Sequence, residues 1–306
     1  MSQFVVQGGK PLNGVIHPQG AKNEALQVIS AVLLTAGEVT IANIPDILDV
    51  NLQIELLRSM GVKVTKTAPD TAVFDASEVD LDYLESDAFH KKSGQLRGSV
   101  MLAGPLLGRF GKAFMPKPGG DKIGRRRLDT HLLGFQQMGA KLSYHDDFGY
   151  YRLTGSQMKG TYLLLDEPSV TGTANLVMAA ALTPGTTTLY HAACEPYLQQ
   201  LCAMINRMGG QISGIGSNLL TIQGVEKLEG TAHRILPDMI EVGSFIGLAA
   251  MTQSALRIAG CGIPFLGIIP EKFRQLGIQF SIEGDDIVVP AQEIYEIQTF
   301  MDGGVL

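Results

Sequence analysis

The chain has 306 residues, of which 45% are hydrophobic and 18% charged. This length suggests about two domains, and such a chain can bury a core large enough to fold without disulfides or metals. Its net charge of −6 argues against general binding of nucleic acids or anionic membranes. We see no leader sequence, no apolar run long enough to span a membrane and no CxxC pair. We therefore expect a cytoplasmic protein without a disulfide framework.

A long repeat runs through the chain. Four amphipathic segments each end in Leu or Met followed by a glycine, and these glycines are Gly61, Gly139, Gly209 and Gly277, at steps of 78, 70 and 68 residues. Glycine in this position typically ends a helix because it tolerates a positive φ. Two β-rich runs around a polar turn follow each glycine, which predicts a hairpin.

A second helix, apolar almost all round, is predicted upstream of each glycine-terminated one. The four segments are 24–35, 98–108, 173–183 and 243–253. A helix without a polar face is buried. A short β-rich segment such as 38–42 or 186–190 separates the two helices. The pattern predicts an α/β fold of repeated β-α-β-α-β-β units that bury their apolar faces against one another.

Three of these predicted buried helices open on polar or cationic residues. The openings are Lys22–Glu24, Arg97–Ser99 and Ser169–Thr173. A helix start offers unpaired N–H groups and the positive end of the helix dipole, and Gly and Ser let an anion approach closely. Capping alone explains any single start. Three starts that converge around a pseudo-threefold axis, with Lys22 and Arg97 among them, indicate a phosphate or diphosphate site.

Basic residues are concentrated between Arg109 and Arg127. This stretch holds seven basic side chains and one acid, Asp121, so its net charge is +6 and the rest of the chain sums to −12. Such a cluster in an acidic protein indicates a small anionic ligand, since arginine forks bind phosphate or carboxylate oxygens. Asp121 either neutralises its neighbours or acts as a general acid or base.

Other patterns predict no further chemistry. The six histidines include no HxxxH or HExxH pair, so we expect no metal site and no cofactor. Cys194 and Cys202 are expected to be small buried apolar residues and not nucleophiles.

Six motifs, in order along the whole chain, resemble the enolpyruvyl transferase family. They are Gly20–Glu24, Gln95–Ser99, Pro118–Gly124, Arg126–His131, Pro168–Val170 and Leu236–Glu241. The resemblance implies an inside-out α/β barrel of two domains, each with three β-α-β-α-β-β units, which agrees with the repeat described above.

The resemblance also implies an activity. It is the transfer of the enolpyruvyl group of phosphoenolpyruvate to the 3-hydroxyl of UDP-N-acetylglucosamine, with release of phosphate, in the first committed step of peptidoglycan synthesis. Lys22 and Asp121 would be catalytic, and Lys22 would hold the phosphate of phosphoenolpyruvate. Asn23 would contact the sugar, and Arg97 and Arg126 would bind phosphates. The uridine diphosphate pocket would be lined by Arg127, Leu128, Asp129, Thr130, His131, Ser169, Val170 and Thr171.

Three residues depart from the family pattern. Asp121 stands where most members carry the cysteine that fosfomycin alkylates, so we expect an active but fosfomycin-resistant site. Arg127 replaces a family proline and Met239 replaces a family arginine. These two changes affect the fine geometry of the pocket and not the class of enzyme.

The number of repeats also departs from the family, with four in place of six. Three repeats, with a catalytic loop at 112–127, form a predicted first domain at residues 22–232. Residues 1–21 and 233–306 form a second, incomplete domain, and we expect its single repeat to expose apolar helix faces. The catalytic-base aspartate and further arginines of the family would lie beyond Leu306, so the chain is expected to be a fragment or a truncated gene product.

Three alternatives remain open from the sequence. One is the sister enzyme that acts on shikimate 3-phosphate, which competition by UDP would distinguish. Another is a catalytically inactive UDP-sugar-binding fragment, which the missing base favours and the presence of Lys22 and Asp121 disfavours. The third is a structural repeat protein that binds partner proteins, which tight binding of UDP-N-acetylglucosamine would exclude.

Overall fold

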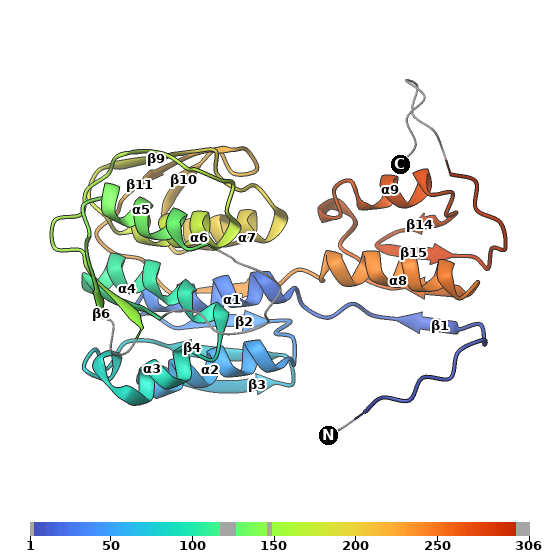
Figure 1. The fold of residues 1–306 in the computed structure, drawn as a ribbon, viewed down its shortest axis with the longest axis horizontal. Coiled ribbons are helices and arrows are strands. Elements are labelled where there is room, and N and C mark those ends of the chain that lie inside the picture. The colour runs from blue at the N-terminus through green and yellow to red at the C-terminus, as the bar shows by residue number, and fades with distance from the viewer. Residues whose placement is uncertain (1–2, 117–126, 146–148, 298–306) are drawn as a thin grey trace. The chain divides into compact units, whose positions relative to one another are not determined.

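A computed structural model describes residues 3–116, 127–145 and 149–297 (Figure 1). The chain forms two compact units, residues 22–235 and residues 1–21 with 236–306. The larger unit ends at 235 and not at 232, because residues 231–234 form a strand of one of its sheets. No helix within the described ranges is long and apolar enough to cross a bilayer.

The first repeat of the larger unit has a four-stranded sheet in the order β12-β2-β4-β3. Its strands are β2 (Val39–Ala42), β3 (Lys63–Ala68), β4 (Thr71–Asp75) and β12 (Thr231–Arg234). Its helices are α1 (Lys22–Ala31), the 3₁₀ helix η1 (Val32–Leu34) that continues it, and α2 (Leu48–Ser59). Strand β12 runs parallel to β2 and comes from the other end of the unit's chain, so this pairing closes the unit.

The second repeat has an antiparallel sheet in the order β5-β7-β6. Its elements are η3 (Arg97–Leu102), α4 (Ala103–Phe110), β5 (Lys112–Pro116), α5 (Asp129–Gln137), β6 (Lys141–His145) and β7 (Tyr150–Thr154), preceded by η2 (Tyr83–Glu85) and α3 (Asp87–Ser93). The buried helix expected at 98–108 therefore begins as a 3₁₀ helix and becomes α-helical at Ala103.

The third repeat shows the complete predicted order β-α-β-α-β-β. Its elements are β8 (Tyr162–Leu164), α6 (Val170–Ala181), β9 (Thr186–Tyr190), α7 (Pro196–Arg207), β10 (Gln211–Ser213) and β11 (Leu219–Gln223). Strands β8 and β9 are parallel and joined through α6, and the sheet continues to the antiparallel hairpin β10–β11.

The smaller unit repeats the same arrangement. Its elements are β1 (Asn13–Ile16), α8 (Met239–Met251), β13 (Ala255–Ile258), η4 (Ile263–Phe265), α9 (Ile269–Gln275), β14 (Ser281–Glu283) and β15 (Asp286–Val289). As expected for the N-terminal strands, β1 joins this repeat, where it runs parallel to β13. Side chains such as Ile246, Ile258 and Ile287 form its buried core.

The four glycines that define the repeat end their helices as predicted. Their φ angles are 92° at Gly61, 103° at Gly139, 99° at Gly209 and 82° at Gly277. These values lie in the left-handed region, which a residue with a β-carbon rarely adopts. A local requirement of the backbone therefore explains the recurrence in the sequence.

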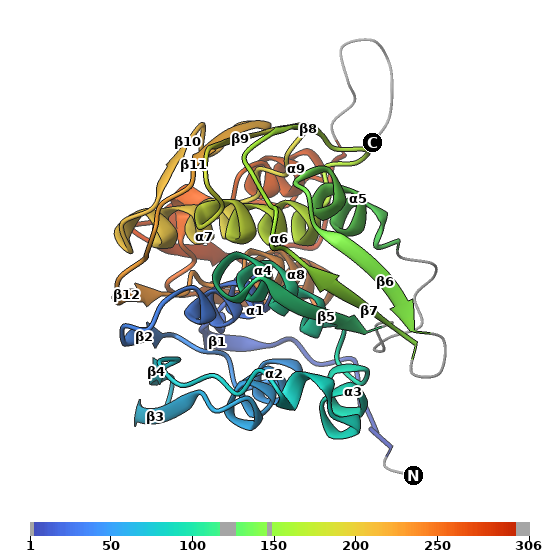
Figure 2. The ribbon, with the colours of Figure 1, turned by 90° about the vertical axis from the view of Figure 1, so that its left-hand side faces the viewer.

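The apolar helices α1, α4 and α6 lie side by side in the interior of the larger unit (Figures 1 and 2). Every residue of α6 from Gly172 to Ala181 is buried. Helix α4 approaches α6 so closely that a β-carbon on Gly104 would lie 2.3 Å from the carbonyl oxygen of Asn175. A small residue at this point lets the two backbones come together.

Helix α8 of the smaller unit carries the exposed apolar side chains that were expected there. Val242 and Ile246 are fully buried in the core of the unit. Ile240, Leu248 and Met251 are 56%, 38% and 88% exposed. The helix is therefore apolar on both its covered and its exposed sides.

Candidate active site

The three predicted helix starts are present in the larger unit. Helix α1 begins at Lys22, η3 begins at Arg97 and α6 begins at Val170. Ser169 caps α6, since its Oγ accepts a hydrogen bond of 3.2 Å from the backbone N–H of Gly172. This bond satisfies one of the N–H groups that the start of a helix leaves unpaired.

The start of α1 adjoins the start of η3. A β-carbon added to Gly98 would lie 3.0 Å from a side-chain carbon of Leu26, so the first turn of η3 packs closely against α1. Lys22 is half-buried and forms an ion pair with Asp49 in the first turn of α2, and Asn23 is exposed. Asp49 is thus a partner of Lys22 that the sequence did not reveal.

His131 joins the start of α6 to η3. It lies on α5 and is 2% exposed. Its Nε2 is 3.1 Å from Oγ1 of Thr171, and its Nδ1 is 2.8 Å from Nδ2 of Asn175. The same amide nitrogen of Asn175 donates to the carbonyl oxygen of Val100, and the backbone N–H of Gly104 donates to its Oδ1. One buried network therefore fixes α5, α6 and the η3–α4 helix relative to one another.

The hydrogen bonds of His131 define its protonation. The amide nitrogen of Asn175 can only donate, so Nδ1 of His131 accepts and the ring proton lies on Nε2, which donates to Thr171. Burial, and to a lesser extent the positive charge of Arg97, lowers the pKa of His131 to about 4. The imidazole is neutral at pH 7. The hydroxyl of Thr171 keeps its own hydrogen to donate to a ligand oxygen.

Two of the residues expected to line the pocket, Thr130 and His131, are buried. Both ring nitrogens of His131 are occupied, and Thr130 is 4% exposed with its hydroxyl 2.6 Å from Oδ1 of Asp166. Arg127 is exposed and pairs with Asp129 at 2.7 Å. Thr171 is exposed and Ser169, Val170 and Leu128 are half-buried, so these four are accessible to a ligand.

Asn175 is the polar residue of this region that the sequence analysis missed. It lies in the run Thr173–Ala181, which is otherwise apolar from Ala174 onward, and it is fully buried. A buried amide must find hydrogen-bond partners because leaving it unpaired is costly. A single Asn inside an apolar helix is therefore a signal for a polar network, although it does not identify the partners.

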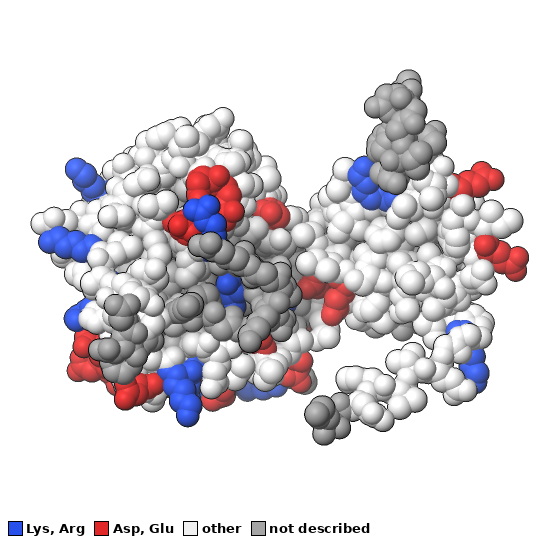
Figure 3. Space-filling view, viewed as in Figure 1, with Lys and Arg blue, Asp and Glu red and all other residues white. Residues whose placement is uncertain are grey.

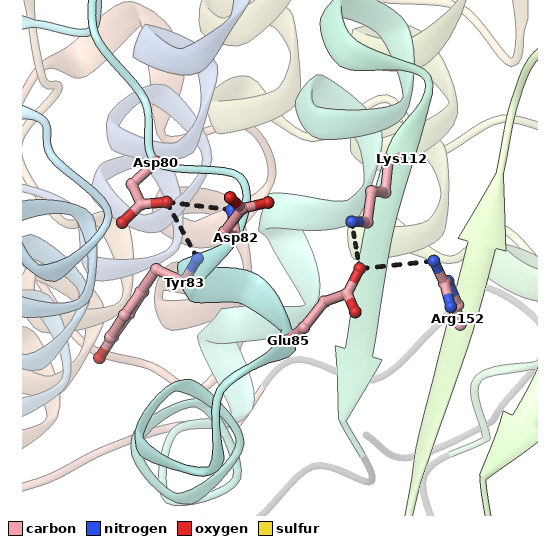
Figure 4. A network of polar contacts seen from close by, with 6 residues as sticks. All are labelled: Asp80, Asp82, Tyr83, Glu85, Lys112 and Arg152. Atoms are coloured by element: carbon pink, nitrogen blue, oxygen red, sulfur yellow. Dashed lines mark hydrogen bonds and ion pairs between the residues drawn. The ribbon is translucent and has the colours of Figure 1, made fainter.

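Two members of the basic stretch, Arg109 and Lys112, make structural contacts. The guanidinium of half-buried Arg109 donates to the carbonyl oxygens of Leu33, Thr35 and Ala76 at 2.7–3.1 Å. Lys112 and Arg152 both contact the carboxylate of Glu85 (Figure 4). The hydrogen bond from Lys112 holds the pKa of Glu85 below its usual value.

The remaining members of the predicted catalytic loop, with Asp121 and Arg126 among them, lie outside the described residues. On the face of the larger unit seen in Figure 3, the described acidic and basic side chains are intermixed. The described charges there do not form one cationic patch.

The cysteines differ from expectation at one position. Cys202 is 1% exposed, and burial raises the pKa of its thiol to about 12, so it is a poor nucleophile as predicted. Cys194 is exposed, because it lies in the connection between β9 and α7 and not within a helix.

The repeated sheets and buried helices define an α/β protein with polar helix starts, and comparisons with known proteins identify its family. The family described as EPSP synthase (3-phosphoshikimate 1-carboxyvinyltransferase) matches residues 6–301. A Bacteroides thetaiotaomicron protein named UDP-N-acetylglucosamine 1-carboxyvinyltransferase is 64% identical over all of this chain and 70% of its own length. A Porphyromonas gingivalis protein of the same name is 62% identical over the same shares.

A solved structure has the same fold. The enolpyruvyl transferase NikO from Streptomyces tendae covers 98% of this chain and 71% of its own, with a TM-score of 0.82 and 22% identity. The chain therefore belongs to the EPSP synthase family of enolpyruvyl (carboxyvinyl) transferases.

Proposed function

We propose that this chain transfers the enolpyruvyl group of phosphoenolpyruvate to the 3-hydroxyl of UDP-N-acetylglucosamine and releases phosphate. The observation that carries this proposal is the 64% identity, over the whole chain, to a protein named for carboxyvinyl transfer to UDP-N-acetylglucosamine. The fold and the polar helix starts support it. Such an enzyme would act in the cytoplasm, in peptidoglycan synthesis, and would affect cell shape and division.

The start of α1 is the proposed binding site for phosphoenolpyruvate. Lys22 brings a positive charge to the end of the helix where the dipole is also positive, and both favour a phosphate. Its ion pair with Asp49 orients the ammonium group before the ligand arrives. We expect Asn23, which is exposed beside it, to contact the sugar.

The start of α6 is the proposed binding site for the uridine diphosphate. Ser169, Val170 and Thr171 offer backbone and hydroxyl groups there, and Nε2 of His131 holds the hydroxyl of Thr171. The charge of Arg97, which acts on His131, favours a diphosphate close by. Arg126, Arg127 and Asp129 remain proposed contributors to the same pocket.

The reaction requires little beyond binding and proton transfer. The 3-hydroxyl gives up its proton to a base as its oxygen bonds to C2 of phosphoenolpyruvate, while C3 takes up a proton. Loss of a proton from C3 then expels phosphate and restores the double bond. Asp121 is the proposed proton donor at C3, and Lys22 would stabilise the developing charge at the phosphate.

The test is release of phosphate from phosphoenolpyruvate by the 306-residue chain, measured with and without UDP-N-acetylglucosamine. Release that depends on the sugar nucleotide and is lost in Lys22→Gln would support the proposal. The matched control is Lys141→Gln, which removes an exposed lysine of β6. Release with shikimate 3-phosphate that UDP does not inhibit would favour the sister activity, and binding of the sugar nucleotide without release would indicate a binding protein.

A further inference from the structure

Three side chains form a hydrogen-bonded array behind the start of α1. Glu24, in the first turn of α1, is fully buried, and its Oε1 lies 2.7 Å from Nε2 of His233 on β12. His233 is 5% exposed, and its Nδ1 lies 2.6 Å from Nη2 of Arg207, the last residue of α7. The array links α7 and β12 to the turn of α1 that begins with Lys22.

The chemistry of these groups fixes where the protons lie. A guanidinium can only donate, so Nδ1 of His233 accepts from Arg207 and the ring proton lies on Nε2. That proton is donated to the carboxylate of Glu24. The imidazole is neutral, and it connects the positive charge of Arg207 to the negative charge of Glu24.

A buried carboxylate at this position has two opposing effects. Its charge is favourable near the positive end of the helix dipole, but it opposes the binding of any second anion at the same helix start. Burial keeps solvent ions from screening it. The positive charge of Arg207, delivered along a polarised chain of hydrogen bonds, offsets the charge of Glu24.

We infer that Arg207 and His233 are positioning and charge-balancing residues for phosphate binding at the start of α1. They hold the carboxylate of Glu24 away from the ligand and offset its charge, so that Lys22 and the helix start attract the phosphate of phosphoenolpyruvate. This inference rests on the proposed function, because it takes phosphoenolpyruvate as the ligand of that helix start.

A double-mutant cycle tests the inference. Arg207 is exposed, so Arg207→Met is expected to fold, and thermal unfolding checks this. Calorimetric titration measures the affinity for phosphoenolpyruvate in the presence of UDP-N-acetylglucosamine, and the affinity for UDP-N-acetylglucosamine itself. Arg207→Met should weaken the binding of phosphoenolpyruvate about fivefold and leave the affinity for UDP-N-acetylglucosamine unchanged. In a Glu24→Gln background, which leaves no carboxylate to hold in place, Arg207→Met should have a clearly smaller effect.

A matched control is Arg234→Met, which removes an exposed arginine next to His233 in β12. It should leave both affinities unchanged. Two results would overturn this inference and leave the proposed function standing. One is that Glu24→Gln and Arg207→Met have independent, additive effects on affinity. The other is that Arg207→Met weakens the binding of both ligands equally. No binding of phosphoenolpyruvate by the unmodified chain would overturn the proposed function and the inference together.

Nitrogen-15 NMR of the imidazole provides a readout that needs no ligand. In the unmodified chain, His233 should be neutral with its proton on Nε2, and Arg207→Met should change the shift of Nδ1. A proton on Nδ1 of His233 in the unmodified chain would contradict the array.

Discussion

The side-chain amide of Asn175 on α6 donates to two acceptors at 2.8 Å, Nδ1 of His131 on α5 and the carbonyl oxygen of Val100 on η3. This one nitrogen therefore sets the tautomer of His131 and anchors the end of η3 near Arg97. The other nitrogen of His131 holds Thr171 at the start of α6. Asn175 thus organises two of the three helix starts from inside the core, without being accessible to a ligand.

Asn175→Ala should destabilise the larger unit strongly. It removes the donor to His131 and Val100 and the acceptor for the backbone N–H of Gly104, and it leaves these groups buried. Such losses cost about 3 kcal/mol of unfolding free energy. Urea unfolding measures the change. Asn51→Ala removes an exposed hydrogen bond to Asp46 and should cost under about 0.5 kcal/mol; equal costs for the two variants would contradict the role of the network.

The buried neutral state of His131 predicts a dependence of stability on pH. Its folded pKa of about 4 lies below the ordinary value of 6.5, so between these values the unfolded chain takes up a proton that the folded chain does not. The free energy of unfolding should therefore fall as the pH is lowered from about 6.5 to about 4, by about 3 kcal/mol for this group.

His131→Gln isolates this contribution of His131. The variant keeps a polar side chain that cannot titrate, and all other ionisable groups remain. Urea unfolding of both proteins at pH 7 and at pH 4.5 gives two differences in unfolding free energy. The difference in unfolding free energy between the two proteins should be smaller at pH 4.5 than at pH 7. A difference that does not depend on pH would show that His131 is not buried in its neutral form.

Gly104 is predicted to be intolerant of even one methyl group. Its added β-carbon would lie 2.3 Å from the backbone oxygen of Asn175, so α4 and α6 must separate and strain the network described above. Gly104→Ala should cost about 1–3 kcal/mol, despite the better helix propensity of alanine. Gly247→Ala in α8 is the control, since the nearest atom to its β-carbon is a ring carbon of Phe273 at 3.8 Å. It should be neutral or stabilising in the same unfolding assay.

The sequence predicted those features that depend on local conformation. The glycine at the end of each helix, such as Gly61 or Gly139, and the apolar faces of α1, α4 and α6 follow from rules that act within a few residues. The motifs at Lys22 and Arg97 located two helix starts in the same way. These features can be predicted without knowing the tertiary contacts of the helices.

Features that depend on distant partners could not be predicted. The pairing of β12 with β2 moved the end of the larger unit from 232 to 235, because it joins segments from opposite ends of that unit. The sequence likewise showed that Arg109 is charged but not that three backbone carbonyls surround it. Composition gives the charge of a stretch, whereas tertiary packing decides which charges remain available to a ligand.

Asp121 is predicted to make the chain insensitive to fosfomycin. A carboxylate is a far poorer nucleophile toward an epoxide than a thiolate, but it can still donate a proton. Inhibition of the unmodified chain at micromolar fosfomycin would contradict this. Asp121→Cys should restore alkylation, and mass spectrometry of the intact protein detects the adduct.

The native cysteines require a control in this experiment. Cys202 and Cys261 are buried, and burial raises the pKa values of their thiols to about 12 and about 11, so both should stay unmodified. Cys194 is exposed, so the comparison is made in a Cys194→Ser background. One adduct should form when Asp121→Cys is present and none when it is absent. An adduct in the Cys194→Ser protein that lacks Asp121→Cys would mean that a buried thiol reacts. If the protein that carries both substitutions forms no adduct, residue 121 does not correspond to the alkylation site of the family.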